Sequence, residues 1–93
     1  MISIKHKGKK AWVNFNYTPD SEVTSVAIVS GWNDWEAENM KAKKDGSFYI
    51  RKYLPVNQQY EFRYLIDQEN WENEPDASTI NNSHGSQNSL LEL

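Results

Sequence analysis

The sequence VTSVAIVSGWNDW at residues 23–35 joins a run of apolar residues to a polar loop that carries two tryptophans. Residues 23–30 are rich in β-branched side chains and short enough for a central β-strand. Trp32 and Trp35 follow three residues apart, on either side of Asn33 and Asp34. One indole can pack over the end of the strand, but a polar loop does not need a second. The stretch therefore predicts a central strand and a loop with one ring more than packing requires.

The composition is that of a small protein with many aromatic residues. Of the 93 residues, 38% are hydrophobic, which predicts one small domain over residues 1–93. Phe, Trp and Tyr make up 13% of the chain, with four Trp among them. Each ring buries ~150–250 Å² of surface, so a core of this size does not easily hide them all. We therefore expect some of the rings to be exposed.

Charge, cysteine content and hydropathy argue against several partners and sites. The net charge of −3 argues against affinity by phosphate neutralisation, so no nucleic-acid partner is expected. The chain has no Cys, which excludes disulfides and thiolate metal sites and is compatible with a reducing compartment. Residues 1–10 lack an apolar region, and no segment reaches the ~18–20 apolar residues of a membrane span. We expect a cytoplasmic protein without a membrane partner.

Period-two alternation, which is typical of antiparallel sheets, recurs along the chain. It predicts strands at 2–6, 11–17, 23–30, 47–54, 58–67 and 88–93, with polar loops at 31–44 and 68–89 and a turn at Asp45 and Gly46. The core sets of the two clearest strands are predicted to be Ala11, Val13, Phe15, Tyr17, Tyr60, Phe62, Tyr64 and Ile66. The predicted fold class is all-β, an antiparallel sandwich or barrel.

Five blocks of sequence in a fixed order resemble one family. They read VAIVSGWNDW, NMKAKKDGSFYI, LP, YEFRYLIDQENWENEPDA and HGSQNSLLEL, and they cover nearly all of residues 23–93. The pattern is similar to the early-set domains of isoamylases and glycogen branching enzymes and to the family 48 carbohydrate-binding modules. These modules include the glycogen-binding domain of the AMP-activated protein kinase β subunit, and RYLIDQENWENEPDA looks closest to short bacterial members that stand alone. The resemblance implies an immunoglobulin-like β-sandwich that binds α-glucans on an open surface.

The resemblance also implies which rings have which role. The family pattern G-F-N-x-W falls on residues 31–35 and makes Trp32 a core aromatic and Trp35 a sugar platform. The pattern Y-x-F-x-V-D-G-x-W places a second platform at Trp71. In place of the usual single Gly, the chain has Gln68 and Glu69, which lengthens the loop before Trp71 by one residue.

Polar ligand contacts are implied in the same way. The basic contact falls on Arg63, and the closing pattern G-x-x-N-S places a hydroxyl-binding amide at Asn88, with His84 and Ser86 beside it. Glucose offers apolar C–H faces and a rim of hydroxyls, which suit flat rings flanked by forked donors and amides. The candidate carbohydrate-binding residues are Trp35, Arg63, Trp71, Asn88, Ser86 and His84.

These residues also have structural alternatives. Either indole can fold back over the sandwich instead of facing a ligand. Arg63 can form an ion pair with a carboxylate such as Asp67, and Asn88 can cap a turn before the last strand.

The loops near the candidate residues are rich in carboxylates, namely Asp34, Glu36, Glu38, Glu69, Glu72, Glu74 and Asp76. A glycosidase needs two carboxylates across the scissile bond, one of them with a pKa raised by burial. Open polar loops do not predict such enclosure, so we interpret these carboxylates as solvated and expect no catalytic residue. His6 and His84 are far apart in a chain without Cys, so no metal or cofactor is expected.

The first functional hypothesis is a non-catalytic module that binds α-glucans such as glycogen, starch or maltooligosaccharides. The second is an interaction module that docks on a glycogen-metabolising enzyme, or on another copy of itself, without binding sugar. The third is a small nucleic-acid-binding barrel that stacks bases on Trp12, Phe15 and Tyr17. The acidic total and the five-block match count against the third hypothesis.

Overall fold

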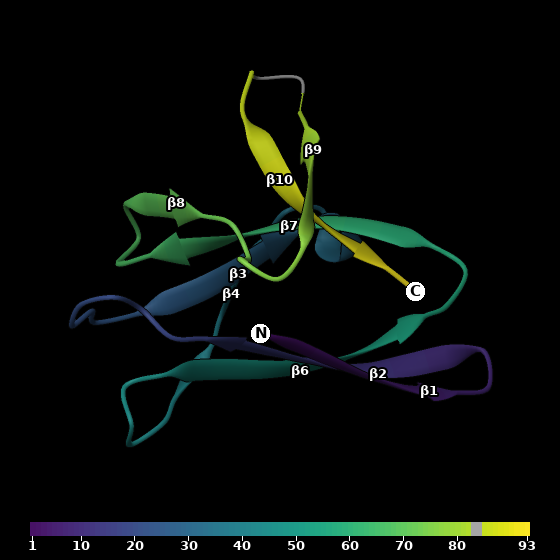
Figure 1. Ribbon diagram of the computed structural model, residues 1–93, viewed down its shortest axis with the longest axis horizontal. Helices are drawn as coiled ribbons and strands as arrows, with labels where there is room; N and C mark the ends of the chain where they lie inside the picture. Colours follow the sequence, from purple (N-terminus) through teal and green to yellow (C-terminus); the bar gives the residue numbers. More distant parts are fainter. Residues whose placement is uncertain (83–84) are drawn as a thin grey trace.

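The computed structural model describes residues 1–82 and 85–93, which form two antiparallel β-sheets packed face to face (Figure 1). The four-stranded sheet has the order β1 (Ile2–Lys7), β2 (Lys10–Tyr17), β6 (Phe48–Pro55) and β5 (Lys41–Ala42). The other sheet has the order β4 (Ala37–Asn39), β3 (Val26–Ser30), β7 (Gln59–Ile66), β10 (Gln87–Glu92) and β9 (Ser78–Asn81), and β8 (Asn70–Glu72) also pairs with β7. Within the described residues no helix is long and apolar enough to cross a membrane. The predicted all-β, immunoglobulin-like antiparallel sandwich is confirmed.

The core lies between the two sheets and consists of the residues that alternation selects. In β2, Ala11, Val13 and Phe15 are fully buried, and in β7 all four predicted core residues are buried. Aromatic rings from the two sheets pack against each other in the core. The Phe15 and Phe62 ring centroids lie 5.2 Å apart in an edge-on arrangement. Of the predicted core set, Tyr17 alone is only partly buried.

Both long segments predicted as loops contain short strands. Residues 31–44 hold a 3-10 turn, η1 (Gly31–Asn33), followed by β4 and β5, and residues 68–89 hold β8, β9 and the start of β10. The strand predicted at 23–30 begins later, at Val26. β4, β5, β8 and β9 are two to four residues long and mostly exposed. They were missed because a polar strand this short carries no alternation of apolar residues.

The strand β7 lies between β3 and β10 in the six-stranded sheet and carries Arg63, one of the predicted site residues. Along one edge β7 pairs with β3, from Val26 opposite Ile66 to Ser30 opposite Phe62. Its other edge is shared, because β10 pairs with residues 59–62 and β8 pairs with residues 64–66. Arg63 therefore lies where these two neighbouring strands part.

The interpretation of the acidic loop residues as solvated is wrong for Glu74. This side chain is fully buried, and its Oε1 accepts hydrogen bonds from the Tyr64 hydroxyl at 2.9 Å and from the Met1 amino group at 2.6 Å. Oε2 accepts a hydrogen bond from the backbone N–H of Asp76. Burial, with the adjacent charge of Glu74, raises the pKa of Tyr64. A carboxylate can be buried here because polar groups surround it.

Glu38 also differs from the expectation. Its Oε2 lies 2.7 Å from Lys52 Nζ on the four-stranded sheet, and both side chains are 26% exposed. Partial burial favours the neutral acid, but the hydrogen bonds from Lys52 and Trp32 and the charge of Lys52 together lower the pKa of Glu38. Glu38 thus links the two sheets.

Candidate functional site

A shallow groove of about 560 Å³ lies on the outer face of the six-stranded sheet. Four of the six predicted site residues line it, namely Trp35, Arg63, Trp71 and Asn88. Its other lining residues are Val29, Glu61, Asn81 and Asn82. Of the remaining predicted residues, Ser86 contacts Arg63, and His84 lies outside the described residues.

Ser30 fixes the start of the loop that carries Trp32 and Trp35. Its buried hydroxyl donates to the carbonyl of Glu61 at 2.8 Å and accepts a hydrogen bond from the backbone N–H of Trp32 at 3.4 Å. This caps η1 and ties it to β7. The Trp32 ring packs against Phe15 and Tyr60, at centroid distances of 5.4 and 6.2 Å. Trp32 therefore packs against the core, as predicted.

Trp35 is held in an uncommon backbone conformation. Asp34 and Trp35 both have positive φ, at 63° and 66°, and the Trp35 N–H donates to the carbonyl of Ser30 at 2.9 Å. Non-glycine residues seldom adopt this conformation, so the chain here is constrained by its contacts. The ring passes over Gly31, and 46% of Trp35 remains exposed.

Trp71 lies in β8, next to the hairpin turn that joins β7 and β8. Asp67 and Gln68 have positive φ, and the Glu69 N–H donates to the carbonyl of Ile66 at 3.0 Å, features of a type I′ turn. Asp67 Oδ1 also accepts hydrogen bonds from the backbone N–H groups of residues 24 and 25. The extra residue of this loop is thus contained in an anchored turn. Trp71 sits opposite Leu65 and is 47% exposed.

Arg63 lies against the second indole. Its guanidinium carbon is 5.1 Å from the centroid of the Trp71 ring, and Nη1 donates to the Ser86 hydroxyl at 3.4 Å. Within residues 1–82 and 85–93 its Nε is buried without a hydrogen-bond partner, and no carboxylate pairs with it. The alternative pairing with Asp67 is therefore not formed.

A polar network forms the floor beside these rings. Asn88 is buried within β10, where its Nδ2 donates to Glu61 Oε1 at 3.0 Å and its Oδ1 accepts a hydrogen bond from Asn82 Nδ2 at 3.2 Å. Asn82 Nδ2 also donates to the Ser86 hydroxyl at 2.9 Å. Asn88 is paired with Ile80 in the sheet, so it does not cap a turn. Its amide instead orients Glu61 and Asn82 toward the groove.

The sequence interpretation missed Glu61 and Asn82 as parts of this groove. Glu61 and Arg63 share the outward parity of one strand, and this signal was available. Asn82 lies in a segment predicted as a loop, where no alternation of residues indicated its direction.

A comparison with known families decides what kind of protein has this groove. Residues 11–93 match the family described as the glycogen recognition site of AMP-activated protein kinase. The chain belongs to this family. No curated protein gave a significant match. The match contains every strand that lines the groove, from β3 to β10, and it confirms the resemblance carried by the five sequence blocks.

The arrangement of the groove suits a sugar better than an ion. Two half-exposed indoles offer flat apolar surface, and neither stacks on another ring within the described residues. Glu61 and Asn82 add an acceptor and an amide at the same surface. No group of three or more metal-ligating side chains lies together in the part of the chain that the structure describes. The family to which the chain belongs is described by recognition of glycogen, which is a binding function.

Proposed function

We propose that the protein binds α-glucans of the glycogen type, without catalysis, in the groove on the outer face of the six-stranded sheet. The observation that carries this proposal is that Trp35 and Trp71, from separate loops, are each about half exposed and line one groove around Arg63. A folded chain gains stability by burying indoles, so two exposed rings on one surface favour a ligand with apolar faces. Family membership supplies the class of ligand.

Each side chain has a proposed role. Trp35 and Trp71 stack on the C–H faces of glucose units. The Arg63 guanidinium, held over the Trp71 ring, donates hydrogen bonds to hydroxyl groups at the edge of the stacked sugar. Glu61 accepts hydrogen bonds from hydroxyl groups. Asn88 and Ser86 act as positioning residues, and His84 is proposed from the family pattern alone.

The shape of the groove sets the expected affinity. An open surface desolvates only one side of a sugar chain, so short maltooligosaccharides should bind with a Kd on the order of 0.1–1 mM, or about −4 to −5 kcal/mol. Polymeric glucans offer many overlapping sites and should be retained more strongly.

The first test is retention on glycogen, measured by affinity electrophoresis in gels that contain the polysaccharide. We expect the unmodified protein to be retarded and Trp35→Ala and Trp71→Ala each to migrate as in a gel without glycogen. Trp12→Ala is the matched control, because Trp12 is an exposed indole on the four-stranded sheet. Retardation of both groove variants equal to that of the unmodified protein would refute the proposed platform. Retardation lost only in Trp12→Ala would place sugar binding on the other sheet.

A further inference from the structure

Although the net charge of the chain is negative, one of its two sheets is basic. The strands of the four-stranded sheet contain no Asp or Glu, and their cationic side chains are Lys5, Lys7, Lys10, Lys41, Arg51 and Lys52. The strands of the six-stranded sheet contain Glu38, Glu61, Glu72 and Glu92 against a single cation, Arg63. The two layers of the sandwich thus carry opposite charge, and an anion is attracted to the face away from the proposed glucan groove.

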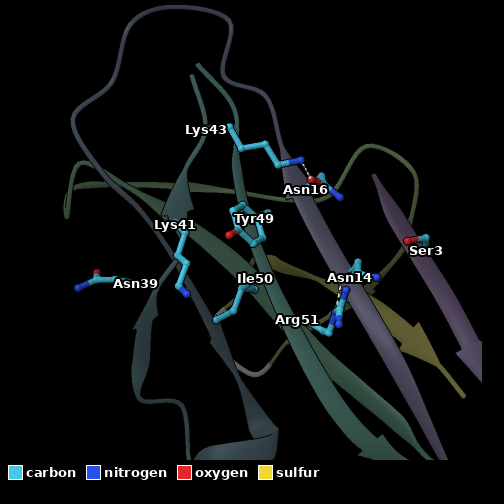
Figure 2. Close-up of a pocket in the computed structure, with 9 residues that line it drawn as sticks. All are labelled: Ser3, Asn14, Asn16, Asn39, Lys41, Lys43, Tyr49, Ile50 and Arg51. Atoms are coloured by element: carbon cyan, nitrogen blue, oxygen red, sulfur yellow. Dashed lines mark hydrogen bonds between the residues drawn. The ribbon is translucent and has the colours of Figure 1, made fainter. Parts of the chain in front are cut away.

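A second groove of about 730 Å³ lies on the basic layer (Figure 2). It is lined by Ser3, Asn14, Asn16, Asn39, Lys41, Lys43, Tyr49, Ile50 and Arg51. Three of these side chains are cations and three are amides, and none is a carboxylate. It is larger than the glucan groove and shares no residue with it.

Arg51 is already oriented for a ligand in this groove. Its Nε donates to Asn14 Oδ1 at 3.0 Å, and its guanidinium carbon lies 5.6 Å from the centroid of the Trp12 ring. The Trp12 ring is itself stacked on Tyr53 at 4.5 Å. Among the described residues Arg51 has no ion-pair partner and its Nη groups have no hydrogen-bond partner. A forked cation fixed in this way suits the oxygens of a phosphate group.

The opposite side of the groove supplies a second cation beside groups that recognise hydroxyls. Lys41 stands opposite Tyr49 in the sheet and is exposed, with no ion pair to any described residue. Lys43 is fixed by a 3.0 Å hydrogen bond to Asn16 Oδ1 and lies 5.2 Å from the Tyr49 ring centroid. Figure 2 shows Lys41 on one side, Arg51 and Asn14 on the other, and Tyr49 between them.

We propose that this groove is a second binding site, for a sugar that carries a phosphate monoester. Arg51 and Lys41 bind the phosphate, while the side chains of Asn14, Asn16 and Ser3 bind the sugar hydroxyls. A bare inorganic anion leaves the amides unused, and a neutral sugar leaves the cations unused, so a ligand with both groups fits the lining best. The proposal does not depend on glucan binding at the other groove. A free sugar phosphate and a phosphorylated polysaccharide present the same chemistry.

The test is an NMR titration with glucose 6-phosphate, with glucose and inorganic phosphate as separate probes. We expect glucose 6-phosphate to give saturable shifts of the Asn14 and Asn16 side-chain amides and the Arg51 Nε–H below about 20 mM. Glucose and inorganic phosphate should each bind at least about fivefold more weakly. An equal response to inorganic phosphate, or no saturation, would overturn the proposal. The indole signals of Trp35 and Trp71 report on the proposed glucan groove. They therefore distinguish failure of the phosphate-site proposal from failure of the glucan proposal.

Variants separate a built site from general positive charge. Arg51→Lys keeps the charge and removes the fork, and we expect about tenfold weaker binding of glucose 6-phosphate. Lys41→Ala should weaken binding by a similar factor, whereas Lys7→Ala, which removes a charge from the same sheet outside the groove, should change it less than about twofold. Equal losses in Lys41→Ala and Lys7→Ala would overturn the proposal.

Two further probes identify the source of the ligand. A maltooligosaccharide that carries one phosphate supports a polysaccharide source if it binds more tightly than glucose 6-phosphate, and a free sugar phosphate if it does not. A single-stranded oligonucleotide that binds more tightly than either would refute a sugar phosphate and favour nucleic acid.

Discussion

Trp35 and Trp71 are exposed by two different local structures. Trp35 follows a capped 3-10 turn and has a left-handed backbone conformation, whereas Trp71 sits in a regular strand next to a tight hairpin turn. Residue type alone did not distinguish them from Trp32, which packs on the core. The family pattern separated the three rings because it specifies the positions of residues relative to these turns, and the turns fix the directions of the side chains.

At Arg63 the shape of the side chain should matter more than its charge. Arg63→Lys keeps one positive charge but removes the planar group that lies over Trp71. We expect maltoheptaose affinity to fall about three- to tenfold, or ~1 kcal/mol, in calorimetric titrations. Unchanged affinity in this variant would show that the stacked guanidinium is not part of the site.

Glu38 should make stability depend on pH. Its pKa is lowered in the folded state, so the ionised form stabilises the fold above the unfolded-state pKa. This contribution is lost as pH falls below the usual titration range of glutamate and through the lowered folded-state pKa. Glu38→Gln should therefore lower the free energy of unfolding by ~1 kcal/mol at pH 7, and the difference should shrink toward pH 3.

Urea denaturation at both pH values checks this prediction. Glu36→Gln is the control, because Glu36 is exposed and its carboxylate has no ion pair among the described residues. A difference for Glu38→Gln that stays constant from pH 7 to pH 3 would contradict the role assigned to its charge.

At the scale of the element, the hairpin between β7 and β8 places Trp71 in the groove and has a strained backbone in its turn. Gln68 has a φ of 62°, a conformation that favours glycine. Gln68→Gly should raise the free energy of unfolding by up to ~1 kcal/mol by relieving this strain, offset partly by the entropy of the unfolded chain. Glucan affinity should stay unchanged, because the register that places Trp71 is fixed by the strand pairs. Thermal unfolding and calorimetric titration measure the two effects, and a large loss of affinity would contradict this account of the turn.

The sequence predicted the strands of five or more residues and missed the shorter, mostly exposed ones. β2 and β7 each place a core residue at every second position, so their limits were predicted to within one residue. β4, β5, β8 and β9 exist because their backbones pair with longer strands, and polar side chains leave no trace of that pairing. The family pattern named Trp35, Arg63, Trp71 and Asn88, which line the groove, but it did not name Glu61 and Asn82 of the polar floor.

At the scale of the molecule, Glu74 joins parts of the chain that are distant in sequence. Its carboxylate binds Tyr64 of β7 and the amino group of Met1, and its backbone N–H donates to the Ser89 hydroxyl of β10. Glu74→Ala leaves the buried Tyr64 hydroxyl without this partner and should lower the free energy of unfolding by ~2–4 kcal/mol. Glu72→Ala, an exposed glutamate two residues away, should change it by less than ~0.5 kcal/mol in the same urea denaturation experiment. Equal effects of the two substitutions would contradict the structural role of Glu74.

The distribution of charge between the sheets shows what total charge cannot predict. The sequence total of −3 argued against affinity by phosphate neutralisation, yet the acidic residues lie in one layer and in the loops. Pairing of β1, β2, β5 and β6 brings their lysines and Arg51 into one sheet. The fold thus offers two surfaces of opposite charge, and the proposals assign a neutral glucan to one and a phosphorylated sugar to the other.

The four indole N–H signals of the protein test the glucan-binding proposal most directly. In an NMR titration with maltoheptaose to several times the expected Kd of ~0.1–1 mM, the signals of Trp35 and Trp71 should shift and saturate together. The signals of Trp32, which packs on the core, and of Trp12, on the other sheet, should stay in place. Four unmoved signals, or a shift confined to Trp12, would contradict glucan binding in this groove.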